Sequence, residues 1–415
     1  MTMSSMGKTT LQSLFYDALA QLDDANFTVR FWDGSVRQFG TGNDFKLHFK
    51  SREALKRMLV DMPLGFGEGY MNGDIEVEGD LKEVVRVGLS SEKLQATTSQ
   101  ALFNIFKLNI LQRNSRKADR QNISFHYDLG NDFYRLWLDQ NLIYSCAYFQ
   151  DDQDSLEQAQ TQKIDLCCRK LQLHPNERLL DIGCGWGSLL INAAKNYGVQ
   201  GFGITLSKEQ LEYGRQQIRQ EGLQDCIRLE YLDYRELAQS KESFDKVVSV
   251  GMFEHVGKAN MKQFLANAQN VLRPGGLLLL HTIGKTVEEP TNSWIKKYIF
   301  PGCHIPDLGS ILKNATGMGL DFIDCENMRI HYSKTLDKWR ERFDRNEKRV
   351  RSMFDDRFIR MWRFYLTGCS ASFLHGSMHV FQLLFSAGVR NDLPLTREWM
   401  LPDIPNGTDT FDYRN

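Results

Sequence analysis

The sequence predicts an α/β protein: a Rossmann-like sheet with a helical insertion, preceded by a small α+β domain. After residue 121, short apolar segments alternate with amphipathic helical segments, which is typical of a parallel sheet covered on both faces. A glycine-rich turn, GCGWG, follows the first of these strands and leads into a helix. The chain of 415 residues is also long for one core, because domains commonly hold roughly 100–200 residues.

The segments after residue 121 follow one another in the order that such a sheet requires. Strands are expected at residues 178–182, 199–204, 227–232, 246–250, 276–281 and 320–326, with residues 380–385 as the closing strand. Helices are expected at residues 188–196, 208–221 and 260–272, and the helical insertion at about 333–375.

Residues 1–100 mix helical and strand patterns and are predicted to form the separate α+β domain. A helix is expected at 11–22, a strand pair turns at Asp33-Gly34, and helical periodicity returns at 81–89 after a glycine-rich stretch. Residues 101–121 change from an amphipathic apolar helix into a basic segment and are predicted to be a linker. Both a solvated hinge and a strip for anionic lipid headgroups fit this segment. The catalytic domain then spans residues 122–415.

Composition limits the partners. The chain has 51 basic and 52 acidic residues, so it carries no overall positive field that would attract a polyanion. No nucleic-acid partner is therefore expected. Its 8 cysteines include no C-x-x-C pair, which favours reduced thiols in the cytoplasm and predicts no metal site. No secretory signal is expected, because the first residues include acids where such a signal would be apolar, and apolar runs such as residues 277–280 are far shorter than the roughly 20 residues that span a bilayer. A soluble or peripheral protein is expected.

The strongest motif is LLDIGCGWGS, at residues 179–188. A strand is predicted to end at Asp181 and a helix to begin after Gly187, so the glycines between them let a ligand approach the backbone amides. A dinucleotide-binding enzyme would place an acid at the end of the second strand, where Thr205 and Gln210 stand instead. The E/D-x-G-x-G form resembles S-adenosylmethionine-dependent methyltransferases.

Further segments narrow this resemblance. They are FHYDLGNDFYRLWLD (125–139), IYSCAYF (143–149), TLSKEQ (205–210), VGMFEHVG (250–257) and LLHTIG (279–284). With them the chain closely resembles cyclopropane-fatty-acyl-phospholipid synthases, from about residue 122 to about 390. The resemblance implies a class I methyltransferase sheet, S-adenosylmethionine and bicarbonate as cofactors, and a homodimer.

The resemblance also carries functional residues onto this chain. The residues matched to S-adenosylmethionine contacts are Tyr144, Ser145, Leu180, Asp181, Gly183, Cys184, Gly185, Gly187, Ser188, Thr205, Leu206, Gln210, Asp233 and Tyr234. Those matched to the bicarbonate-binding cluster are Cys146, Glu254, His281, the backbone of Ile283, and Tyr332. The implied catalytic residues are Cys146, Glu254, His281, Tyr332 and Cys369. For Cys369, small neighbours favour helix packing over chemistry, because the expected reaction needs no nucleophilic thiol.

The chemistry explains why such a cluster is needed. An isolated alkene that attacks a sulfonium methyl group becomes a carbocation, which must be kept from water and can be stabilised by aromatic faces. A base then removes a proton so that the ring closes, and bound bicarbonate is the expected base. Glu254 follows the fourth strand and His281 ends the fifth, so both are expected at the carboxyl edge beside the glycine loop.

The implied function is transfer of a methylene carbon from S-adenosylmethionine to the double bond of unsaturated acyl chains in membrane phospholipids, which forms cyclopropane fatty acids. The enzyme is then expected at the inner face of the cell membrane, bound peripherally. The insertion, where arginines and aromatic residues alternate over 339–366, fits a cover over an acyl-chain tunnel and equally an ordinary amphipathic helix pair. Three alternatives stay open: methyl or methylene branching of the acyl chain, methylation of an amine headgroup, and a non-catalytic lipid-binding or lipid-transfer protein.

Overall fold

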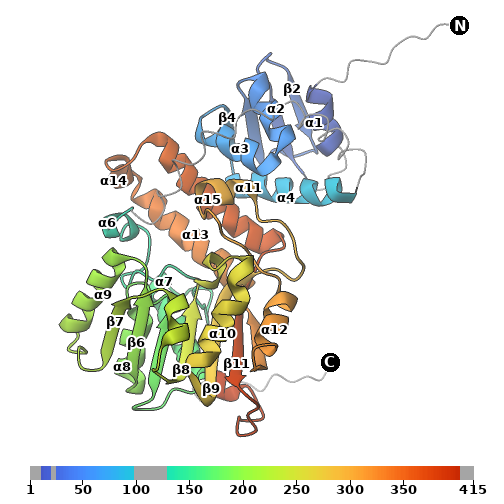
Figure 1. The fold of residues 1–415 in the computed structure, drawn as a ribbon. Coiled ribbons are helices and arrows are strands. Elements are labelled where there is room, and N and C mark those ends of the chain that lie inside the picture. The colour runs from blue at the N-terminus through green and yellow to red at the C-terminus, as the bar shows by residue number, and fades with distance from the viewer. Residues whose placement is uncertain (1–10, 20–24, 98–128, 402–415) are drawn as a thin grey trace, which may run out of the picture.

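A computed structural model of the chain describes residues 11–19, 25–97 and 129–401. It contains two sheets, one formed by the N-terminal part of the chain and one by the C-terminal part (Figure 1). The predicted linker, residues 101–121, lies outside the described residues. Within the described ranges, no helix combines the length and the apolar character needed to cross a membrane.

The N-terminal unit is a four-stranded sheet in the order β2-β1-β3-β4, packed against helices. Its strands are β1 Phe27–Arg30, β2 Val36–Phe39, β3 Phe45–Phe49 and β4 Ile75–Gly79. Its helices are α1 Leu11–Leu19, α2 Arg52–Val60, α3 Met62–Met71 and α4 Leu81–Thr97. The β1–β2 pair turns at Asp33-Gly34 as predicted, and Gly34 takes the left-handed φ of 83° that favours glycine there.

Helix α3 forms in the glycine-rich stretch, where no helix was expected. The Asp61 carboxylate caps its first turn by accepting the Leu64 amide at 3.1 Å, and a proline in that turn needs no hydrogen-bond donor there. The glycines serve close packing: a Cβ at Gly65 would overlap the backbone of α2, and a Cβ at Gly67 would overlap the indole ring of Trp294. Tertiary contacts therefore outweigh the low helix propensity of glycine.

The C-terminal unit confirms the predicted α/β class, with a seven-stranded sheet in the order β10-β11-β9-β8-β5-β6-β7. Its strands are β5 Arg178–Ile182, β6 Gln200–Thr205, β7 Ile227–Tyr231, β8 Phe244–Val250, β9 Leu272–Gly284, β10 Leu320–Asn327 and β11 His379–Ala387. The pairs among β5 to β9 are parallel, whereas β11 runs antiparallel to both of its neighbours. The expectation of a parallel sheet therefore holds for five strands, because β11 returns from the insertion in the opposite direction.

Helices cover both faces of this sheet. One face carries α7 Leu156–Lys170, α8 Ser188–Tyr197 and α9 Lys208–Gln220, and the other carries α10 Met261–Val271 and α12 Leu308–Thr316. Each face of the sheet has its own apolar core. Successive residues of β5 contribute to the two cores in turn: Leu179 packs on the first face and Leu180 on the second. The remaining short elements are α6 Asn131–Tyr134, α11 Ser293–Tyr298, η3 Tyr234–Gln239, η4 Phe253–His255, η5 Lys258–Asn260 and η6 Glu398–Met400.

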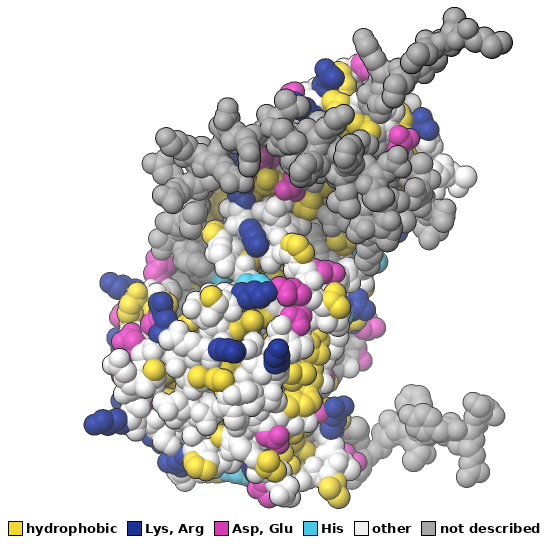
Figure 2. Space-filling view, turned by 45° about the vertical axis from the view of Figure 1, so that its right-hand side comes forward, with side chains coloured by type: hydrophobic (Ala, Val, Ile, Leu, Met, Phe, Trp, Pro, Cys, Tyr) yellow, Lys and Arg dark blue, Asp and Glu magenta, His cyan; other side chains and the backbone are white. Residues whose placement is uncertain are grey.

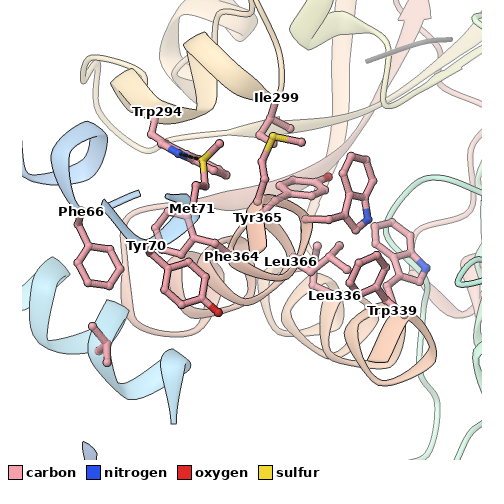
Figure 3. Close-up of a cluster of buried hydrophobic side chains, with 14 of the residues drawn as sticks. Phe66, Tyr70, Met71, Trp294, Ile299, Leu336, Trp339, Phe364, Tyr365 and Leu366 are labelled. Atoms are coloured by element: carbon pink, nitrogen blue, oxygen red, sulfur yellow. Dashed lines mark hydrogen bonds between the residues drawn. The ribbon is translucent and has the colours of Figure 1, made fainter. Parts of the chain in front are cut away.

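The helical insertion lies between the two sheets (Figure 1). It consists of α13 Arg329–Arg345, α14 Glu347–Arg351 and α15 Asp356–His375, and α15 packs against both α3 and α4. Figure 3 shows the apolar cluster at this junction, where the Trp294 indole N–H donates to the Met71 sulfur at 3.2 Å. The Phe364 ring lies edge-on to Trp294 at 4.7 Å and tilted against Phe66 at 5.5 Å. These contacts join the N-terminal unit to α11 and α15 of the C-terminal unit.

Several arginines of the insertion form ion pairs with acidic side chains of the same chain. Such pairs include Arg340–Asp344, Arg342–Glu157, Arg360–Glu76 and Arg363–Glu347. Figure 2 likewise shows basic and acidic side chains interspersed over one face of the molecule, in keeping with the formal net charge of -1. These arginines therefore have a structural role, because two of the pairs lie within the insertion and two join it to α7 and β4.

We predict that Gly67→Ala destabilises the protein by about 1–3 kcal/mol, because the added methyl group overlaps the buried Trp294 indole. Urea unfolding of the full chain measures this change. Gly368→Ala is the matched control: it is also a helix position, and its Cβ would meet only the Phe364 ring at 3.9 Å. The control should be neutral, or more stable by up to about 1 kcal/mol. Equal stability of both variants would contradict the packing role of Gly67.

Candidate functional site

One continuous cavity of about 1280 Å³ runs from the carboxyl edge of the seven-stranded sheet to the apolar interior of the N-terminal unit. Asp181 at the end of β5 lines one end, and Leu47, Phe66 and Val84 line the other. Helix α15 contributes Phe373 and other residues to the wall between them. The volume exceeds the roughly 300–1,000 Å³ of an ordinary small-molecule site, so two ligands can share the cavity.

The glycine loop after β5 leaves open space at one position. Gly183, Gly185 and Gly187 have φ values of 89°, 54° and 85°, all in the left-handed region. The amides of Gly183 and Cys184 both donate to the Ile204 carbonyl at 3.0 Å, so they are already paired, contrary to the expected approach of a ligand to them. A Cβ at Gly185, in contrast, would meet no described atom within 4 Å. A ligand can therefore lie against the loop at Gly185.

Beneath this loop lies a buried pair of charged residues, Asp181 and Lys163. Burial raises the pKa of Asp181 to about 7, opposed by the positive charge of Lys163. The Asp181 Oδ1 atom has no hydrogen-bond partner, and Lys163 donates to the Ser145 hydroxyl at 3.0 Å. A buried carboxylate oxygen without a partner is costly, so this atom can accept a hydrogen bond from a ligand amino group.

Farther along the cavity lie Glu254, in the turn η4 after β8, and His281, which stands within β9 because this strand continues to Gly284, beyond its expected end at His281. The Glu254 Oε1 atom accepts the Ile283 amide at 2.5 Å, while its Oε2 atom has no partner. Burial raises the pKa of Glu254 to about 7. Burial, together with the charges of Lys163 and Lys170, lowers the pKa of His281 well below 6.5, so this imidazole is neutral near pH 7.

Tyr332 and two cysteines complete this part of the wall. Tyr332 enters from α13, and burial raises the pKa of its phenol well above 10. The Cys146 thiol donates to the Ala147 carbonyl at 3.2 Å, and burial raises its pKa, so its proton is already used. Burial raises the pKa of Cys369 to about 12, which keeps this thiol neutral and agrees with a packing role. The cluster therefore presents neutral donors and one titrating carboxyl to the cavity.

Comparison with known proteins decides the family. The family described as mycolic acid cyclopropane synthetase matches residues 114–383. The chain belongs to this family. A domain of unknown function, DUF7884, matches residues 14–100.

Curated relatives of this enzyme match most of the chain. A probable fatty acid methyltransferase of Pseudomonas putida is 39% identical over 383 residues, covering 90% of this chain and 95% of its own length. The cyclopropane-fatty-acyl-phospholipid synthase of Escherichia coli K12 is 38% identical over 360 residues, covering 85% and 90%. The crystal structure of mycolic acid cyclopropane synthase CmaA1 with SAH and CTAB is 33% identical, with a TM-score of 0.60, covering 64% of this chain and 97% of that one.

The family places this enzyme among the methyltransferases that bind S-adenosylmethionine, with the class I sheet. Two observations of this structure indicate that the residues present fit that cofactor. The open space at Gly185 allows a ligand to lie against the loop, and the partnerless Asp181 oxygen suits a cationic amino group.

The structure brings most of the sequence-predicted residues to the cavity. Those that line it are Tyr144, Ser145, Cys146, Asp181, Gly183, Cys184, Gly185, Ser188, Thr205, Leu206, Gln210, Tyr234, Glu254, His281, Ile283, Tyr332 and Cys369. Three others do not line it. Leu180 is buried in the core, Gly187 caps α8, and the Asp233 carboxylate accepts hydrogen bonds from Arg235 at 2.5 and 2.9 Å. The roles of all these residues remain predictions.

Sequence reasoning missed buried polar residues at and behind the cavity, of which Lys163, in its lining, is the clearest. A signal was present in α7, where Leu156, Lys163, Cys167 and Lys170 recur at helical spacing on one buried stripe. Lysines within such a stripe are unusual, because burial of a lysine without a partner is costly. That pattern alone indicates two lysines with internal partners.

We predict that Gly185→Val abolishes binding of S-adenosylmethionine, because a β-branched residue is strained at a φ of 54° and its methyl groups enter the cavity. Isothermal titration calorimetry measures the affinity. Gly222→Val is the control, since Gly222 has a φ of 69° with nothing near its Cβ position and does not line the cavity. A folded Gly185→Val protein with unchanged affinity would remove the cofactor from this loop.

A second prediction concerns stability in the absence of ligands. The folded-state pKa of Glu254, about 7, lies above its ordinary value of 4.5. Its contribution to stability is therefore present below pH 4.5 and lost as the pH rises through 7. Between about pH 5 and pH 8, the free energy of unfolding of the wild type should fall by about 2 kcal/mol relative to Glu254→Gln. Denaturant unfolding at each pH tests this, and parallel pH profiles would refute it.

Proposed function

We propose that this enzyme transfers a methylene carbon from S-adenosylmethionine to the double bond of an unsaturated acyl chain in a membrane phospholipid, with bicarbonate as the base. The observation that carries the proposal is the continuity of the cavity. The glycine loop, the Glu254 and His281 cluster and an apolar compartment lined by Phe66 and Val84 share one space. A cofactor at the loop and an acyl chain in the compartment would therefore meet at the cluster.

The apolar end of the cavity supports a lipid chain as the acceptor. Its lining comes from the N-terminal unit, through Phe27, Leu47 and Met58, and from α15, through Phe364 and Phe373. An acyl chain gains free energy by leaving water for such a lining. We assign residues 1–100 a role in lipid binding on this basis, with the enzyme bound peripherally to the inner face of the cell membrane. A homodimer is part of the proposal, and light scattering tests it.

When bound, S-adenosylmethionine supplies an electrophilic sulfonium methyl group to the double bond. The π electrons of the acceptor would form the new carbon–carbon bond as the sulfur–methyl bond breaks, which would leave a carbocation in the acyl chain. The rings of Phe300, Tyr332 and Tyr365 line this region, exclude water and offer π faces to the resulting carbocation. Loss of a proton from the transferred carbon then provides the electron pair that closes the ring.

Three groups could hold the bicarbonate base beside that proton. Tyr332 and His281 can donate hydrogen bonds, and a protonated Glu254 can donate through its partnerless Oε2 atom. The Ile283 amide and the Cys146 thiol, both expected in the anion site, are paired with Glu254 and with a backbone carbonyl. They would support the site through Glu254 and through packing. An amine acceptor would need no such cluster, which disfavours headgroup methylation.

Analysis of lipids from bacteria that express the protein tests the reaction. We expect each modified acyl chain to gain one CH₂ by mass and to lose its olefinic signals in proton NMR while cyclopropane ring signals appear. A gain of CH₂ with an exocyclic methylene signal would indicate branching instead. Unmodified lipids from cells that contain folded protein would contradict the proposal.

We predict that Glu254→Gln lowers turnover on phospholipid vesicles about 100-fold while affinity for S-adenosylmethionine changes less than twofold, because proton handling changes and packing does not. Added bicarbonate should partly restore turnover where only anion binding is weakened, and should have no effect where Glu254 itself relays the proton. Glu212→Gln is the control, since the Glu212 side chain is 72% exposed. Near-normal ring formation by Glu254→Gln in carbonate-depleted buffer would contradict the proposed role of Glu254 in proton removal.

A further inference from the structure

A line of buried polar contacts leads from His281 away from the cavity. The His281 Nδ1 atom lies 3.1 Å from the Gln382 amide nitrogen in β11. The ammonium group of Lys170, at the end of α7, donates to the Gln382 amide oxygen at 2.8 Å and to a Glu326 carboxylate oxygen in β10 at 2.5 Å. His281, Gln382 and Lys170 are 3%, 1% and 2% exposed, so water does not compete for the contacts among these three residues. None of the three residues behind His281 has a role in the steps above.

Lys170 determines which way the Gln382 amide faces. An ammonium group is a donor only, so its partner on Gln382 must be the carbonyl oxygen. The opposite orientation would place the amide NH₂ against the ammonium group, two donors with no acceptor between them. The Gln382 NH₂ group therefore faces His281, and its Nε2 atom also lies 3.5 Å from the Cys167 sulfur. The side-chain orientation, which is often ambiguous for glutamine, follows here from the charge of its neighbour.

This orientation in turn fixes the proton on His281. Because the Gln382 nitrogen donates, the His281 Nδ1 atom must accept. The imidazole is held neutral by its burial and by the charges of Lys163 and Lys170. Its single proton then lies on Nε2, and His281 lines the cavity.

We propose that Lys170 and Gln382 are positioning residues that hold His281 as its Nε2–H tautomer, so that it acts in the cavity as a hydrogen-bond donor and not as a base. Glu326 balances the buried charge of Lys170, which lets the ammonium group remain in place. The tautomer rests on these contacts alone, whereas its importance for ring closure rests on the proposed function.

Two-bond ¹H–¹⁵N NMR correlation of the full chain, labelled with ¹⁵N-histidine, tests the tautomer directly. Of the 9 histidines, His281 is assigned by the signal missing from His281→Gln. We expect Nε2 to be protonated in the wild type. In Gln382→Glu, a carboxylate between Lys170 and His281 should accept a hydrogen bond from a protonated Nδ1 and so favour the opposite, Nδ1–H tautomer. Gln200→Glu, at an exposed position in β6, is the matched control and should leave it unchanged.

The inverted tautomer should lower kcat on the order of 100-fold, as for loss of one preorganised donor, with affinity for S-adenosylmethionine within twofold. Lys170→Met, which frees the amide to rotate, should give a mixture of tautomers and keeps the test available where Gln382→Glu does not fold. A protonated Nδ1 in the wild type, or an unchanged tautomer in folded Gln382→Glu, overturns the proposal while leaving the Glu254 test of function intact. Inversion with full turnover overturns the catalytic importance of the donor and counts against the proposed role of His281.

Discussion

The burial of ionisable side chains at the carboxyl edge of the sheet is the constraint on which the site depends. Asp181 lies near the end of β5, Glu254 in the turn η4 that follows β8, and His281 in the last part of β9, and each is at most 5% exposed. Removal from water costs free energy for every charged form, which moves the pKa values of both carboxyls to about 7 and keeps the histidine neutral. The same dry environment suits a reaction in which a carbocation must not meet water.

The sequence predicted the frame of this site well, for identifiable reasons. Strand β5 has the predicted bounds, because its apolar run stops at a glycine that takes a left-handed conformation. Glu254 and His281 were expected at one edge, since parallel strands present their carboxyl ends together. The other strands differ mainly at their ends, where hydrogen bonding with neighbours determines how far a strand continues; β9, for example, extends over Leu272–Gly284.

What the sequence did not predict depends on contacts between distant segments. Helix α3 forms in a stretch rich in glycine because Gly67 packs against Trp294, and this contact joins residues far apart in the chain. Gln382 has no distinctive motif, and its importance comes from pairing of β11 with β9, which places Gln382 opposite His281. Asp233 is the exception: it matches a family position, yet its carboxylate accepts hydrogen bonds from Arg235, two residues along the chain.

The direct connection between α15 and β11 has a consequence for redesign of the enzyme. Residues 364–373 of α15 line the apolar part of the cavity, and Gln382 follows within ten residues in β11. A substitution that reshapes the apolar pocket through α15 therefore falls in the helix that leads directly into the strand carrying Gln382. Under the proposed function, variants with altered acyl selectivity are best sought on the walls contributed by the N-terminal unit, which lie far from Gln382 in the chain.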